Sequence, residues 1–308
     1  MFNLAAHNGL LPPGHGAILS PARAAGPPSS SPSALSSPTC RGYGDEWIAG
    51  GNDRLSERYL DTGALSFDVY AIRDKFSGYI VAMQSIPSMH DPDALAHVFL
   101  DAVEEEQGAA ANIVVGNGAE NHLLLQTQVT LHTQSGAPPG STTLYEFGTP
   151  NVSLRGLWTQ WMRIHGRALQ IAIQDEAGPA GFDPSDYTHL LVGLYVWRTV
   201  IQRSLDNLRN TMNMSPVHSS QSKKAAGLPS GHTPTAARRG FAGGQRCIVP
   251  CDLGAVRRLR DEDVGSRATF VDPEFDEAAL SACREMGNPA LSRANAWAVW
   301  AELVRRMS

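Results

Sequence analysis

The sequence predicts an α/β domain in which helices flank a mixed sheet. Short alternating or β-branched segments at 66–74, 78–86 and 113–115 favour strands, whereas apolar residues recur at helical spacing over 95–103 and again from residue 151 onward. The stretch NIVVGNGAEN at 112–121 is the most informative: its apolar run breaks at Gly116-Asn117-Gly118, so a buried strand ends at a polar edge. α/β enzymes place their chemistry at such edges.

Composition limits the function classes. A chain of 308 residues with 42% hydrophobic residues can hold one large or two modest domains. The net charge of −5 gives no global attraction for nucleic acid, so such binding would need a local basic patch. Four cysteines and an opening without a secretion signal favour an intracellular, reduced protein, and no apolar run approaches the roughly 20 residues that span a bilayer.

Changes in composition divide the chain into four parts. Residues 1–44 are rich in Pro and Ser and are predicted to be a disordered leader. Residues 45–215 carry the regular patterns and form the predicted domain. Residues 216–245 lose periodicity and gather Gly, Ser, Lys and Arg, so we expect a flexible, mildly basic linker. Residues 246–308 form a small C-terminal region with helical character.

The first elements of the domain have clear signals. We expect a short strand from Trp47, an antiparallel hairpin formed by 66–74 and 78–86, and the strand that begins at Asn112. Between the hairpin and that strand, Asp91-Pro92-Asp93 starts a helix that runs to Glu106 with one apolar face.

The later elements are less regular until residue 151. Residues 122–131 fit a helix or an irregular strand, 136–140 a loop, and 142–147 a short strand. Two helices follow, over 151–174 and 183–213, the second largely buried because its middle is apolar all round. The C-terminal region is expected to hold a strand and a short helix within 248–264 and two helical pieces within 276–307.

Five local motifs, in this order along about residues 45–220, resemble the core domain of retroviral and retrotransposon integrases, and most of all the integrase-core proteins of fungal genomes. They are WIAGGNDRL, DKFSGYIV, NIVVGNGAEN, PNVSLRGLW and SLDNLRNTMNMSPVHS. The resemblance implies a ribonuclease-H-like mixed sheet and descent from a mobile element whose ancestral reaction was polynucleotidyl transfer in DNA integration. It also implies a nuclear location; without it we expect a cytoplasmic one.

We do not expect this chain to bind the catalytic metal ions of the family. Integrase cores hold two Mg²⁺ or Mn²⁺ ions with three carboxylates. At the matching positions this chain has Gly50, Gly116 and Arg155. Two glycines offer no ligand and a guanidinium repels cations, so we expect no cofactor and a catalytically inactive protein, a pseudoenzyme.

Two alternatives to an inactive nucleic-acid-binding core stay open. Nearby acids could replace the missing ligands and keep a metal nuclease active: Asp53, Asp61, Asp68, Asp74, Glu120 and Glu146. The chain could also act as a scaffold for protein interaction or for pairing of two copies. Arg155, Arg163 and Arg167 are the candidates for contacting DNA or RNA, and a solvated helix face explains them equally well.

For two other sequence patterns a structural role is favoured over a ligand-binding one. Cys247 and Cys251 lack a second ligand pair at zinc spacing, so unpaired thiols are favoured over a metal site. Gly116-Asn117-Gly118 has no Lys-Ser/Thr after it, so a tight turn is favoured over a phosphate loop.

Overall fold

The computed structural model describes residues 40–51, 60–137, 142–144, 152–218 and 227–308. Thr39–Ser308 forms one compact unit. Its strands are β1 (Glu46–Gly51), β2 (Asp68–Asp74), β3 (Ile80–Ile86), β4 (Gly108–Ala109), β5 (Asn112–Val115), β6 (Thr142–Leu144) and β7 (Val249–Pro250). Its helices are α1 (Pro92–Glu106), α2 (His122–Gln134), α3 (Val152–Trp161), α4 (Arg167–Gln174), α5 (Tyr187–Met214), α7 (Pro234–Arg238), α8 (Leu253–Arg258), α9 (Pro273–Glu285) and α10 (Ala296–Met307).

A five-stranded mixed sheet in the order β3-β2-β1-β5-β6 forms the centre of the fold. β1 pairs antiparallel with β2, which pairs antiparallel with β3, so the predicted hairpin is confirmed. On its other side β1 pairs parallel with β5, and β5 pairs parallel with β6. Parallel strands need a crossover connection, and α1 supplies it between β3 and β5.

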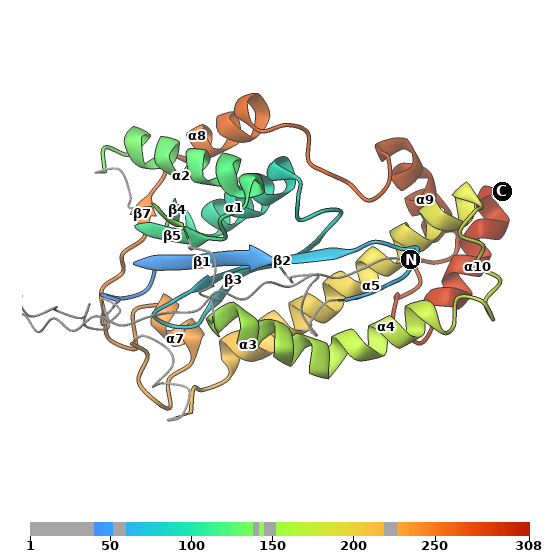
Figure 1. The fold of residues 1–308 in the computed structure, drawn as a ribbon, viewed down its shortest axis with the longest axis horizontal. Helices are drawn as coiled ribbons and strands as arrows, with labels where there is room; N and C mark the ends of the chain where they lie inside the picture. The colour runs from blue at the N-terminus through green and yellow to red at the C-terminus, as the bar shows by residue number, and fades with distance from the viewer. Residues whose placement is uncertain (1–39, 52–59, 138–141, 145–151, 219–226) are drawn as a thin grey trace, which may run out of the picture. The chain divides into compact units, whose positions relative to one another are not determined.

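Helices cover both faces of the sheet, as Figure 1 shows. The strands alternate between the two faces: in β1, Trp47 and Ala49 pack with α1 and α2, whereas Ile48 packs with α3 and α5. This alternation divides the core into two large apolar layers, one on each side of the sheet. The prediction of an α/β fold with a mixed sheet flanked by helices is therefore confirmed.

The predicted helices are present, and the structure differs from the prediction in two details. Residues 122–134 form helix α2 and not an irregular strand. The helix expected over 151–174 contains a five-residue π turn, Met162–Gly166, between α3 and α4. A Cβ at position 166 would collide with the sulfur of Met162, so the glycine permits the close packing of this wider turn.

Residues on either side of the predicted domain pack against it. Tyr43, assigned to the leader from sequence, is 2% exposed and lies in the core, so that boundary is too late. In the segment expected to be a flexible linker, residues 227–245 include α7, and Leu228 packs on Phe76. Residues 1–39 and 219–226 lie outside the described residues.

The C-terminal region continues over both layers. α8 and the π turn Leu259–Asp263 pack on α1, where Arg260 forms ion pairs with Asp101 and Glu104 at 3.2 and 2.9 Å. α9 and α10 pack on α5 with Trp297 and Trp300 among the buried residues. Among the described residues, no helix has both the length and the apolar character that crossing a membrane requires.

α5 also protects the edge of the sheet at β3. Asn213 accepts a hydrogen bond from the backbone N–H of Ile80 at 2.8 Å and donates one to its carbonyl at 3.0 Å. Gln202 bonds Ser85 and Met83 in the same way, at 2.8 and 3.0 Å. Edge strands carry unpaired backbone groups that promote aggregation, and these side chains satisfy several of them.

We predict that Asn213→Ala lowers the free energy of unfolding by about 1 to 3 kcal/mol, because the buried N–H of Ile80 loses its acceptor. Urea denaturation followed by circular dichroism measures the change. Asn210→Ala, at an exposed position of the same helix, is the control and should change stability little. Equal effects of the two variants would show that the edge contact contributes nothing.

Candidate functional site

The ends of two parallel strands form the candidate site. In the parallel pairing of β1 with β5, Ile48 lies beside Val114. Gly50 lies two residues after Ile48, and Gly116 lies two residues after Val114. Both glycines are therefore at the same edge of the sheet. The first turn of α3 packs against this edge, because a Cβ built on Gly50 would lie 3.1 Å from a methyl carbon of Leu154. The structure therefore brings the three matched positions to one edge of the sheet, with Arg155 exposed next to Leu154.

Neutral hydrogen bonds organise this edge. The side-chain amide of Asn121 donates to the carbonyl of Gly116 at 3.1 Å, and its oxygen accepts from the hydroxyl of Tyr70 at 3.2 Å. Asn121 is 4% exposed and Tyr70 2%, and burial raises the pKa of the Tyr70 phenol. Sequence reasoning did not identify Tyr70. Its place on β2, opposite Gly51, was the signal available once the hairpin register was known.

Glu120 is the acid that contacts this cluster. Asn121 donates to its carboxylate at 3.2 Å, and a Cβ at Gly118 would collide with that carboxylate, so the side chain is folded over the turn. One carboxylate cannot hold two metal ions. Among the described residues, no three His, Cys, Asp or Glu side chains group in a way that could hold a metal ion.

The other candidate acids have structural partners elsewhere. Asp68 accepts from the backbone N–H of Met89 at 2.9 Å, and Asp61 from that of Gly63 at 3.0 Å. Asp74 lies at the opposite end of β2 from Asp68 and accepts from Gly44 and Ser77. Asp53 and Glu146 lie outside the described residues. The acids that the structure describes thus do not converge beside Gly50 and Gly116.

The residues of this site do not fit Mg²⁺ or Mn²⁺. These ions take several oxygen ligands, mostly carboxylates and waters. Gly50 and Gly116 offer no side chain, and Arg155 carries a positive charge. The polar groups beside them are the Asn121 amide, the Tyr70 phenol and the single carboxylate of Glu120. Such an edge can donate and accept hydrogen bonds, but it lacks the charge needed to activate a water or to stabilise a leaving oxygen.

The three candidate arginines lie on the exposed side of α3, its π turn and α4. Arg155, Arg163 and Arg167 are all exposed. Arg155 and Arg163 form no ion pair with another described residue, whereas Arg167 donates to Gln170 at 3.5 Å. Residues 152–174 contain no Asp or Glu, so this helical stretch is locally basic in an acidic chain.

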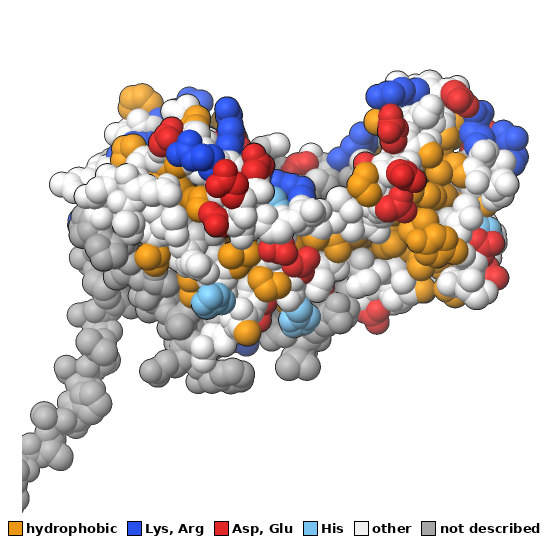
Figure 2. Space-filling model, turned by 90° about the horizontal axis from the view of Figure 1, so that it is seen from above, with side chains coloured by type: hydrophobic (Ala, Val, Ile, Leu, Met, Phe, Trp, Pro, Cys, Tyr) orange, Lys and Arg blue, Asp and Glu red, His pale blue; other side chains and the backbone are white. Residues whose placement is uncertain are grey.

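Several arginines elsewhere are paired with acids. On the face seen in Figure 2, basic and acidic side chains are interspersed. Arg267 pairs with Asp101 at 2.6 Å, and on α5 Arg209 pairs with Glu105 at 2.7 Å. Paired arginines are poor phosphate ligands because their donors are occupied, so the exposed side of α3 and α4 is the better candidate for an anion-binding surface.

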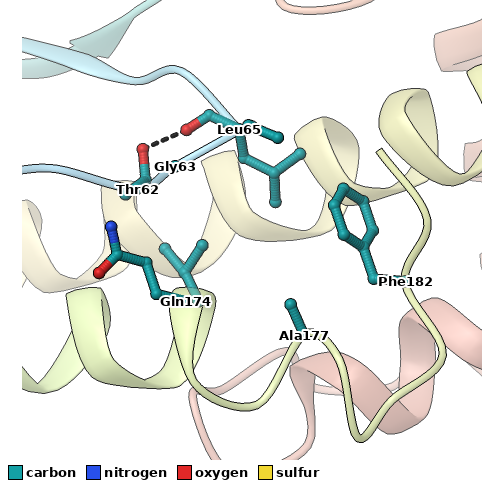
Figure 3. A pocket seen from close by; sticks show the side chains of 8 residues that line it. Thr62, Gly63, Leu65, Gln174, Ala177 and Phe182 are labelled. Atoms are coloured by element: carbon teal, nitrogen blue, oxygen red, sulfur yellow. Dashed lines mark hydrogen bonds between the residues drawn. The ribbon is translucent and has the colours of Figure 1, made fainter. Parts of the chain in front are cut away.

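A pocket of about 160 Å³ lies apart from this site. It is formed by the loop before β2 and the end of α4, and its lining is largely apolar, with Leu65 and Phe182 pointing into it (Figure 3). Thr62 donates to the carbonyl of Leu65, which occupies its hydroxyl. The lining contains no charged or nucleophilic side chain, so this pocket offers no chemistry.

Comparison with models of known protein families finds no match, and comparison with characterised proteins finds none either.

The buried Asp74 makes stability depend on pH. Burial raises the pKa of Asp74 from 3.8 to about 6, although hydrogen bonds from Ser77 and Gly44 partly offset the shift. Because the folded pKa lies above the unfolded one, this group's stabilisation is full below about pH 4 and is lost as pH rises through about 6.

We predict that the wild-type protein loses about 1 kcal/mol more unfolding free energy than Asp74→Asn between about pH 5 and pH 7.5. Urea denaturation of both proteins across this range measures the difference. Parallel profiles for the two proteins would mean that Asp74 does not titrate in this window.

Proposed function

We propose that this chain is a catalytically inactive integrase-core-like protein with a ribonuclease-H-like fold, derived from a mobile element. The strand order β3-β2-β1-β5-β6, with one crossover helix between β3 and β5, supports the proposal, since it is the arrangement that the resemblance implies. The observation that carries it is the site itself. Three segments far apart in sequence meet at the matched positions, and they bring two glycines and an arginine.

The ancestral reaction requires what these positions lack. Polynucleotidyl transfer needs metal ions to activate a water or a 3′ hydroxyl and to stabilise the leaving oxygen. Without the carboxylates the chain retains the arrangement of strands and helix around the site but cannot catalyse the reaction. Core packing and catalysis are separable properties, so a fold can persist after its chemistry is gone.

Binding of nucleic acid is the function that such a protein can keep. Arg155 and Arg163 project from a helical stretch without acids and pair with no acid in the described part of the chain, so they can contact phosphates. The scaffold alternative has less support: α5, the helix offered for pairing of two copies, lies against β3, α9 and α10. Most of its apolar residues are therefore buried within the chain, and the exposed Tyr187 and Met214 lie at its two ends.

We predict that a triple variant, Gly50→Asp, Gly116→Asp and Arg155→Glu, gains affinity for Mn²⁺. A Cβ at Gly116 meets nothing closer than 3.8 Å, and at Gly50 only the flexible end of Leu154 must move. A ligand that binds only the folded state raises the melting temperature, so a thermal-shift titration with MnCl₂ measures the gain.

The matched control carries Asn, Asn and Gln at the same three positions, which adds similar volume without charge. The wild-type protein and this control should show no Mn²⁺-dependent shift. Equal responses of the acidic and neutral variants would contradict an integrase-core arrangement of the site. Metal-dependent cleavage of DNA by the wild-type protein would contradict its inactivity.

We predict that the wild-type protein binds labelled 20-base-pair DNA weakly at low salt and that binding ignores Mg²⁺. Replacing Arg155, Arg163 and Arg167 with Gln should lower the slope of log affinity against log salt by about 0.9 for each phosphate that the variant no longer binds. Fluorescence anisotropy across a NaCl titration measures both quantities. An unchanged slope in the variant would exclude these arginines from binding.

A further inference from the structure

The strongest charge segregation in the chain lies outside the integrase-like site. Residues 207–251 contain six Lys and Arg and no Asp or Glu, although the whole chain has a net charge of −5. The six are Arg209, Lys223, Lys224, Arg238, Arg239 and Arg246. The segment includes the stretch RRGFAGGQR at 238–246, where arginines flank an aromatic residue within a glycine-rich turn.

Phe241 lies at the centre of that turn and faces solvent. It is 75% exposed, more than any other large hydrophobic side chain in the described ranges. Leaving a phenylalanine in water forgoes the favourable free energy of burying its ring. The neighbouring residue Ala242 is 4% exposed and packs with Ala237 and Phe76, so the segment as a whole is not detached.

The backbone fixes this exposed ring in place. Phe241 donates from its N–H to the carbonyl of Ala236 at 2.9 Å, and Gly240, at φ +81°, donates to Ala237 at 3.0 Å. This pair of bonds ends α7 in a glycine cap. α7 itself is anchored by Arg238, whose guanidinium lies 2.6 Å from the buried carboxylate of Glu106. The ring is therefore presented from an anchored turn.

The two arginines near Phe241, Arg239 and Arg246, differ in how free their side chains are to bind a ligand. Arg239 is exposed, and its side chain forms no hydrogen bond or ion pair with any other residue that the structure describes. Arg246 is less available, because it donates to the carbonyl of Arg238 at 3.0 Å, pairs with the buried carboxylate of Glu106 at 3.7 Å and lies over the ring of Tyr43. An exposed aromatic ring with an accessible guanidinium group beside it is the combination that binds single-stranded nucleic acid without sequence preference.

We propose that residues 239–246 form a binding element for single-stranded nucleic acid. A base stacks on Phe241, and Arg239 contacts a flanking phosphate. A double-stranded ligand is disfavoured because its bases are already stacked on one another and cannot cover the ring. This element is separate from the three arginines of α3 and α4, so it goes beyond the proposed function and does not depend on integrase ancestry.

The test is fluorescence anisotropy of the full chain with a labelled 20-nucleotide oligouridine and with the 20-base-pair DNA, across a NaCl titration. Phe241→Ala should weaken oligouridine binding about 5- to 100-fold, the range that one base–aromatic stack contributes, and Phe241→Trp should preserve it. Arg239→Gln should lower the salt slope by about 0.7. Tyr187→Ala removes another exposed aromatic side chain, 70% exposed at the start of α5, and should change nothing.

Three outcomes would overturn the proposal. Oligouridine binding that survives Phe241→Ala with unchanged affinity would exclude stacking on this ring. Loss of oligouridine binding in the variant with Gln at 155, 163 and 167, but not in Phe241→Ala, would assign all binding to α3 and α4 and leave the proposed function standing. Absence of binding to either probe at low salt would overturn both nucleic-acid surfaces, while the Mn²⁺ titration would still test the integrase-like site.

Discussion

The parallel pairing of β1 with β5 is the constraint on which the rest of the structure depends. It joins β1, the strand beside the β2–β3 hairpin, to the later strands of the sheet, and the parallel connection requires α1 as the crossover. It also puts the ends of both strands at one edge, so Gly50 and Gly116 meet although they lie far apart in sequence. The two apolar layers follow from the same pairing, because side chains of β1 and β5 alternate in phase toward α1 or toward α3.

The interactions that stabilise this edge of the sheet do not involve a metal ion or charged catalytic groups. The edge of the sheet is held by the neutral bonds of Asn121 to Gly116 and Tyr70, which need no metal and no charge. Clustered carboxylates at this edge would repel one another in the absence of a metal ion, whereas the glycines and the Asn121 amide introduce no such repulsion. Leu154, Leu157 and Trp158 remain buried on α3, whereas Arg155 between them faces solvent. The packing of the helix therefore does not depend on the side chain at position 155.

Sequence patterns predicted most of the fold, because capping and periodicity are local. Asp91 caps α1 and Asp186 caps α5 by accepting backbone hydrogen bonds, and both helix starts are readable from sequence. The C-terminal contacts were not readable, since the docking of α8 and the following π turn on α1 brings together residues more than 150 positions apart, such as Arg260 and Glu104. Tyr70 was missed for the same reason: its bond to Asn121 exists only after β2 and β5 join one sheet.

Gly50 and Gly116 lie at one edge of the sheet, where the surrounding side chains do not fit a metal ion. The most direct measurement is a ¹H–¹⁵N correlation spectrum of the wild-type protein, recorded during titration with paramagnetic Mn²⁺. Because glycine amides resonate in a separate region, Gly50 and Gly116 can be followed individually. The account predicts that both signals keep their intensity relative to those of distant glycines such as Gly181. Selective broadening of Gly50 and Gly116 together would show that this edge still binds a metal ion and would contradict the account.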